Sequence, residues 1–144
     1  MRIAIGCDHA GIEQKPAIAE YLSAKGFEVV DLGCYSAERV DYPDYAVKVS
    51  ECVASGDADF GILICGTGIG MSIAANKVAG IRAANVTRAD MAPLARQHND
   101  ANVLTLSARF VALEENEAII DAFLAAEFEG GRHEGRVAKI NALD

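Results

Sequence analysis

The chain has 144 residues, 51% of them hydrophobic and 24% charged, with a formal net charge of −8. This length fits one domain with a full core, and the acidic balance excludes nucleic-acid binding through a basic stripe. No apolar run approaches membrane-spanning length, and the first residues enter a strand directly, which leaves no room for a signal peptide. The four cysteines form no C-x-x-C pair, so we expect free thiols in a reducing cytoplasm.

Strands and helices are predicted to alternate along the whole chain. The predicted strands cover residues 2–7, 27–32, 60–65, 81–86 and 102–106. The predicted helices cover residues 13–25, 44–55, 69–78, a segment ending near His98, 113–126 and a short stretch of the tail. Thr87 and Asp90 have capping-box spacing before the fourth helix. Nearly all-apolar strands in this alternation predict a parallel sheet covered on both faces, in one domain spanning residues 1–144.

Ligands of open parallel sheets bind at the carboxyl ends of the strands. This rule brings four stretches to one edge of the predicted sheet: residues 7–9, 65–70, 86–87 and 107–109. Their polar side chains are therefore candidates for a single site.

The most informative stretch is residues 60–70, FGILICGTGIG, in which a buried strand ends at Cys65 and three alternating glycines precede a helix. Glycines at such a turn let backbone N–H groups converge on an anion or a developing oxyanion. Cys65 would then lie at the mouth of an anion nest, next to a helix N-terminus that favours a thiolate. The alternative is a structural glycine turn beside a buried cysteine.

Three familiar motifs are excluded by counting along this stretch. A dinucleotide fingerprint needs a third glycine where Met71 stands, and a P-loop needs Gly-Lys-Ser/Thr, which is absent. A cysteine phosphatase would need an arginine shortly after the thiol, but residues 66–71 include no basic residue.

Three other clusters each have a functional and a structural interpretation. Asp8 and His9 end the first strand, where Asp8 could instead be a helix N-cap and His9 a solvated side chain. The cluster at residues 96–100 ends a helix, where His98 could merely be a favourable partner of the helix dipole. Arg132 and Arg136 are four residues apart and could clamp a phosphate together, or form a solvated pair.

Taken together, these clusters resemble the type B ribose-5-phosphate isomerases of the ribose/galactose sugar-phosphate isomerase family. The resemblance covers essentially the whole chain, in matching order. Its motifs are residues 6–11 (GCDHAG), 41–44 (DYPD), 65–70 (CGTGIG), 74–77 (AANK), 80–82 (GIR), 96–100 (RQHND) and 129–133 (EGGRH) with Arg136. Of the family's cysteine and glutamate variants, the chain resembles the cysteine variant.

The resemblance implies a Rossmann-like, three-layer α/β/α fold with a five-stranded parallel sheet in the order 2-1-3-5-4. It implies a homodimer, or a dimer of dimers, with active sites between subunits and with no metal or organic cofactor. Cys65 would be the base and His98 would open the cyclic sugar, while the nest would hold an enediolate. The implied substrate-binding residues are Asp8, His9, Tyr42, Gly66, Thr67, Gly68, Ile69, Gly70, Asn99, Arg109, Arg132 and Arg136, with His98, Asn99 and Arg109 coming from the partner chain.

The expected function is aldose–ketose isomerisation of ribose 5-phosphate and ribulose 5-phosphate. Such a reaction needs a base for the carbon-bound proton and donors for the enediolate oxygens, and Thr67 adds a hydroxyl to the latter. One alternative is a six-carbon substrate such as allose or galactose 6-phosphate. Another is a non-catalytic sugar-phosphate sensor, although a sensor has no need of Cys65 and His98 in addition to a phosphate clamp.

Overall fold

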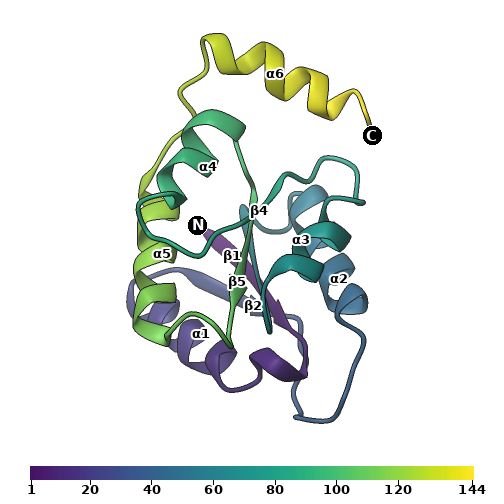
Figure 1. Cartoon of the computed structure of the whole chain (residues 1–144), viewed down its shortest axis with the longest axis vertical. Helices are drawn as coiled ribbons and strands as arrows, with labels where there is room; N and C mark the ends of the chain where they lie inside the picture. The colour runs from purple at the N-terminus through teal and green to yellow at the C-terminus, as the bar shows by residue number, and fades with distance from the viewer.

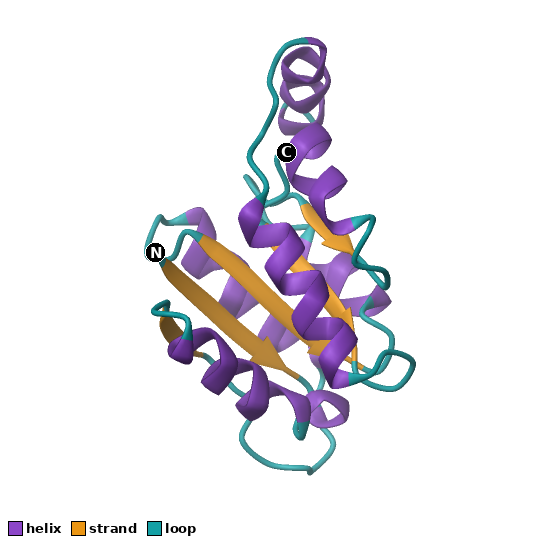
Figure 2. Ribbon diagram, turned by 90° about the vertical axis from the view of Figure 1, so that its left-hand side faces the viewer, coloured by secondary structure: helices purple, strands orange, loops and turns teal.

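The computed structural model describes residues 1–144 and contains one sheet of five parallel strands in the order β2-β1-β3-β5-β4. Both the parallel sheet and this order are confirmed. The strands all run in one direction, as the arrows in Figure 2 show. They are β1 (Arg2–Cys7), β2 (Glu28–Asp31), β3 (Phe60–Cys65), β4 (Ala83–Asn85) and β5 (Val103–Ser107).

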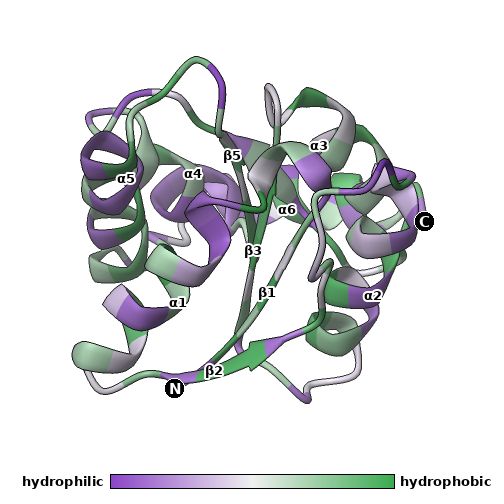
Figure 3. Ribbon diagram, turned by 90° about the horizontal axis from the view of Figure 1, so that it is seen from below, coloured by the Kyte–Doolittle hydropathy of each residue, from purple (hydrophilic) through white to green (hydrophobic).

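Helices cover both faces of the sheet and give the expected three layers (Figure 3). One layer holds α1 (Gln14–Ala24), α4 (Ala92–Asn99) and α5 (Leu113–Ala125), and the other holds α2 (Tyr42–Ala54) and α3 (Ile69–Ala75). A short 3-10 helix, η1 (His9–Gly11), follows β1, and α6 (Arg132–Asn141) follows α5. No helix is long and apolar enough to cross a membrane.

The core divides into two clusters because alternate residues of a strand face opposite sides of the sheet. Ile62 and Ile64 of β3 pack with residues of α1 and α5, including Phe123, in a cluster of 18 buried residues. Leu63 and Cys65 face the other layer in a cluster of 11 buried residues. The strand pattern therefore aims the Cys65 side chain toward α3.

Several predicted boundaries shift by one to three residues. Helix α2 begins at Tyr42 rather than Asp44, because Pro43 occupies the first turn, where a helix needs no amide donor. The capping-box prediction is wrong. Helix α4 begins only at Ala92, after an N-cap at Met91, and Asp90 instead pairs with Arg88.

Helix α6 lies away from the strands' carboxyl ends, beyond the C-terminal end of α4 (Figures 1 and 2). The N–H of Glu129 donates to the carbonyl of Gln97 at 3.1 Å, which fixes the start of this segment to α4. Arg82 Nη1 donates to Asn141 Oδ1 at 3.0 Å, and Gly80 N–H donates to Asp144 Oδ2 at 2.8 Å. These contacts hold α6 at the amino edge of the sheet.

Candidate active site

Cys65 ends β3 and lies beside the glycine turn that the sequence predicts to be a nest. Its side chain is buried, and its Sγ accepts a hydrogen bond from the N–H of Gly68 at 3.1 Å. Gly68 has φ of +81°, and a Cβ there would collide with Asn85 Oδ1, so glycine is required on both counts. The turn thus fixes the thiol at the N-terminus of α3.

The Thr67 hydroxyl is free to donate a hydrogen bond. Thr67 Oγ1 accepts the N–H of Ile69 at 3.2 Å, so the hydroxyl hydrogen stays free for another acceptor. Two N–H groups of the turn, those of Gly68 and Ile69, therefore already donate within it. The hydroxyl adds a donor to the same half-buried turn.

Tyr42 and His9 border the turn from the neighbouring segments. The Tyr42 ring lies against Gly70, where an added Cβ would approach its Cε2 and Cζ to 2.7 Å. His9 Nδ1 accepts the N–H of Val40 at 3.3 Å, which assigns the proton of the neutral ring to Nε2 and leaves that atom as a donor.

Asp8 is buried and also has the capping role that the sequence offered as an alternative. Its Oδ1 accepts the N–H of Ala10 at 2.9 Å at the start of η1. The N-cap interpretation of Asp8 is thereby confirmed. The cap occupies one carboxylate oxygen and leaves the other available to a ligand.

Arg109 lies against the turn of its own chain. A Cβ on Gly66 would be 3.1 Å from Arg109 Nη1 and 3.2 Å from its Cδ. Arg109 takes this position because the loop after β5 folds back over β3, with the N–H of Arg109 donating to Gly66 O at 3.1 Å. Ser107 Oγ stabilises that loop by donating to Gly66 O at 2.8 Å and accepting the N–H of Phe110 at 3.0 Å.

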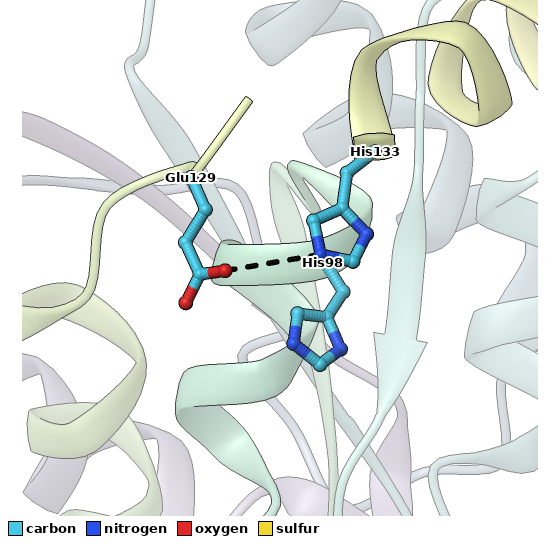
Figure 4. Close-up of side chains that lie close together, drawn as sticks. All are labelled: His98, Glu129 and His133. Carbon is cyan, nitrogen blue, oxygen red and sulfur yellow. Dashed lines mark ion pairs between the residues drawn. The ribbon is translucent and has the colours of Figure 1, made fainter. Parts of the chain in front are cut away.

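His98 lies elsewhere, at the C-terminal end of α4, and stacks on His133 of α6 (Figure 4). The ring centroids are 4.4 Å apart and the planes differ by 14°. Glu129 Oε2 lies 3.8 Å from His133 Nε2. Burial, together with the positive charge of Arg132, lowers the pKa of His133, so its ring is neutral at neutral pH.

The two arginines proposed as a phosphate clamp lie on the same helix as His133. Arg132 and Arg136 are both exposed, while His133 and Val137 of the same turns are buried. The four-residue spacing places the two guanidinium groups on one solvent-facing side of α6. Asn99 is also exposed and immediately follows His98. Because His98 stacks on His133, Asn99 and the two arginines belong to the two helices that meet there, and these residues make up a second group.

These two groups of residues lie at opposite edges of the sheet within one chain. Cys65 pairs in register with Ser107, the last residue of β5, whereas α4 ends just before Val103, the first residue of β5. Four strand steps at about 3.3 Å each separate the edges by about 13 Å. One chain therefore does not bring His98 to Cys65.

His133 and Asn85 were not predicted as contributors to these two groups, whereas Ser107 was among the candidate polar residues at the strand ends but its contacts were not foreseen. His133 follows Arg132 in a quoted motif, but helical spacing alone does not show that it faces His98. Ser107 and Asn85 act through contacts with Gly66 and Gly68, which depend on strand pairing that the sequence alone did not specify.

Comparison with known proteins identifies the family of the chain. A family model described as Ribose/Galactose Isomerase matches residues 3–140. The chain is 53% identical to ribose-5-phosphate isomerase B of Escherichia coli over 143 residues, which are 99% of this chain and 96% of that protein. The chain belongs to the ribose/galactose isomerase family.

Solved structures share the fold along the whole chain. One is ribose-5-phosphate isomerase B of Clostridium thermocellum, with a TM-score of 0.98 and 54% identity, covering 99% of this chain and 97% of that one. Another is ribose-5-phosphate isomerase B of Mycoplasma genitalium with bound ribulose 5-phosphate. Its TM-score is 0.95 at 52% identity, and the match covers 99% of this chain and 95% of that one.

Proposed function

We propose that this protein interconverts ribose 5-phosphate and ribulose 5-phosphate. The observation that carries the proposal is the Cys65 sulfur held beside a glycine turn by the Gly68 amide. This arrangement combines a group that can move a proton with the free Thr67 hydroxyl, a donor for an oxyanion. It occurs in a chain more than half identical to ribose-5-phosphate isomerase B of Escherichia coli.

In the proposed reaction His98 helps to open the furanose ring, and Cys65 then removes the proton from C2 of the aldose. The electron pair of that C–H bond forms a C1–C2 double bond, and the carbonyl oxygen becomes an enediolate oxygen. The turn and the Thr67 hydroxyl stabilise this charge. The thiol returns the proton to C1, while a second proton moves from the C2 oxygen to the C1 oxygen.

The remaining polar residues bind and orient the sugar phosphate. Arg132 and Arg136 can each present two parallel N–H donors of a planar fork to a phosphate, a geometry that the lysine ammonium lacks. Asp8, His9, Tyr42 and Asn99 are suited to the sugar hydroxyls. Arg109 lies on the turn beside the thiol and adds positive charge there.

We propose that a homodimer assembles the complete site, with His98, Asn99, Arg132 and Arg136 of one subunit facing Cys65 of the other. A two-fold axis would create two equivalent sites of this kind. Exposed apolar side chains around the turn support a covering partner. Ile69 and Ile73 of α3 are 54% and 62% exposed, and Phe110, next to Arg109, is 79% exposed.

The shared site is tested by mixing two inactive proteins, Cys65→Ala and His98→Asn, unfolding them together and reassembling them. Random pairing makes half of the dimers heterodimers, each with one intact and one doubly damaged site, so roughly a quarter of wild-type activity returns. Each variant reassembled alone is the control. An inactive mixture in which mass spectrometry shows heterodimers would place the base and the histidine in one chain's site.

Substrate identity is tested with a coupled assay that compares ribose 5-phosphate, allose 6-phosphate and galactose 6-phosphate at equal concentrations. Fastest turnover of ribose 5-phosphate supports the proposal. Preference for a six-carbon sugar phosphate would reassign the substrate, and binding without turnover of any of them would identify a sensor.

We place the enzyme in the cytoplasm, which its four free cysteines support.

A further inference from the structure

Three side chains that metal ions commonly use as ligands meet at the amino edge of the sheet. His98 comes from the end of α4, Glu129 from the segment before α6, and His133 from α6 (Figure 4). One ligand atom from each lies within 4.8 Å of the other two. The end of α4 and the segment 129–133 thus converge on one small volume.

One of these side chains has an unmet bonding capacity. His133 is 4% exposed, and its Nε2 has no hydrogen-bond partner. That atom points toward Glu129, whose carboxylate at 3.8 Å is too far away for a hydrogen bond but close to the separation of two ligands around one ion. A buried polar atom without a partner is uncommon and calls for an explanation, which a bound ion would supply.

We propose that His98, Glu129 and His133 bind a divalent transition-metal ion such as Zn²⁺, and that this ion inhibits the isomerase by taking up His98. The binding stands on the geometry alone, whereas the inhibition rests on the proposed role of His98. Two imidazoles and one carboxylate suit Zn²⁺, Co²⁺ or Ni²⁺ and leave a fourth position open. Mg²⁺ and Ca²⁺ require more oxygen ligands than this cluster provides.

Binding requires a modest rearrangement, and the exposure of the ligands allows it. Tetrahedral Zn²⁺ with bonds of about 2.0–2.1 Å places its ligand atoms about 3.4 Å apart. Glu129 is exposed and half-buried His98 can turn, whereas His133 is fixed by burial. The nearly parallel rings direct their lone pairs alongside each other, so His98 must rotate to share an ion with His133.

The charges around the three ligands determine which metal ions can bind to them. Arg132 and Arg136 flank His133 on α6 and oppose any cation, while Glu129 contributes the one negative charge of the cluster. Only an ion that bonds strongly to imidazole nitrogen overcomes this repulsion. A phosphate on the arginines would reduce the repulsion, so binding is measured first without phosphate or substrate.

The binding test uses Co²⁺, whose visible absorption reports tetrahedral coordination. The full-length Cys65→Ser protein is titrated, so that this thiol cannot contribute. The expected result is one Co²⁺ per chain, displaced by Zn²⁺ but not by Mg²⁺. Glu129→Gln and His133→Gln should each weaken binding about tenfold or more.

The matched control is Glu134→Gln, which removes the same charge from an exposed position in the first turn of α6 and should bind like the parent. Equal Co²⁺ affinity in Glu129→Gln and Glu134→Gln would overturn the proposed site. Because Glu129 is exposed, its substitution should not disturb folding, so this comparison holds even if His133→Gln fails to fold.

The inhibition test compares turnover of ribose 5-phosphate with and without Zn²⁺ in the wild-type protein, in Glu129→Gln and in Glu134→Gln, each relative to its own metal-free rate. Inhibition that is weakened only in Glu129→Gln supports the proposal. Occupied metal without inhibition would overturn the inhibitory role. The metal-free rate itself tests the proposed isomerase function, so failures of the two proposals are distinguishable.

Discussion

The amide of Gly68 donates to the sulfur of Cys65 across 3.1 Å, although the two residues are three apart and the chain reverses between them. The reversal depends on the left-handed backbone of Gly68, whose φ is +81°. A conformation that only glycine adopts readily therefore orients the Cys65 thiol.

Gly68→Ala is predicted to inactivate the enzyme. A left-handed alanine costs about 1–2 kcal/mol in backbone strain, and its Cβ would collide with Asn85 Oδ1, so the turn must move. Gly80→Ala is the matched control because Gly80 has the same φ of +81° with nothing near an added Cβ. Thermal unfolding should show the backbone strain in both variants and an additional loss of stability in Gly68→Ala from the collision. Equal activity in both would show that the collision is relieved without moving the thiol.

Cys65→Ser is predicted to lower kcat by orders of magnitude with little change in KM. Serine preserves the shape and the hydrogen bond from Gly68, but its hydroxyl is a far weaker acid than a thiol. Steady-state kinetics with ribose 5-phosphate measures this separation. Cys52→Ser, at a half-buried position on α2, serves as the control and should keep its rate. Near-normal turnover in Cys65→Ser would assign the base elsewhere.

Arg132→Ala and Arg136→Ala are each predicted to raise the KM for ribose 5-phosphate by about tenfold or more, since each removes a charge-assisted contact of roughly 1.5–3 kcal/mol. Lysine substitutions should also be costly, because the two-pronged geometry is lost. Turnover of free ribose should change little, and Arg88→Ala, an exposed arginine paired with Asp90, should leave both substrates unaffected. Equal losses on the two substrates would contradict the clamp.

The buried Lys15 is predicted to tolerate replacement by methionine better than it tolerates loss of its partner. Its Nζ lies 2.5 Å from Asp31 Oδ1 and 4.5 Å from the centre of the Tyr35 ring, and the side chain is 1% exposed. Asp31→Ala leaves a buried charge unpaired and should cost up to about 3 kcal/mol, whereas Lys15→Met fills similar volume with no charge. Urea unfolding of both variants measures the difference, and the reverse order would refute this asymmetry.

Cys7 is predicted to be the least reactive thiol toward a disulfide reagent in the native protein at pH 8. Burial and the neighbouring Cys34 raise the pKa of Cys7 to about 12, so the reactive thiolate is absent there. Because this pKa is raised on folding, the stability it contributes is present below about pH 9 and is lost as pH rises toward 12. Half-buried Cys52 should react faster than Cys7. Rapid labelling of Cys7, located by mass spectrometry, would be the contrary result.

Apolar strands alternating with helices were enough to predict the layers, the parallel sheet and the position of Cys65 at its carboxyl edge. The first residues of helices were harder to predict, because several neighbouring residues can each serve as the N-cap. Thr87 and Asp90 have the right spacing, but Asp90 binds Arg88 and Pro93 suits a later first turn. The contact between His98 and His133 could not be predicted, since it depends on how the segment before α6 returns to α4.

The same limit applies to Arg109. The sequence places it after β5, but only the folded loop shows that it contacts Gly66 of its own chain. Contacts between segments distant in sequence thus supplied what periodicity and spacing could not.

Helix α6 lies at the edge of the sheet opposite Cys65, so the proposed reaction needs residues from two subunits. In the proposed homodimer, one subunit supplies the proton-transfer chemistry, while the other supplies the phosphate anchor and the ring-opening group. The distance between anchor and base is then set by how the subunits dock and not by any loop within a chain. The length of the sugar that the site accepts then depends on how the two subunits dock. A change at the subunit interface can therefore alter substrate preference without changing any side chain of the proposed site.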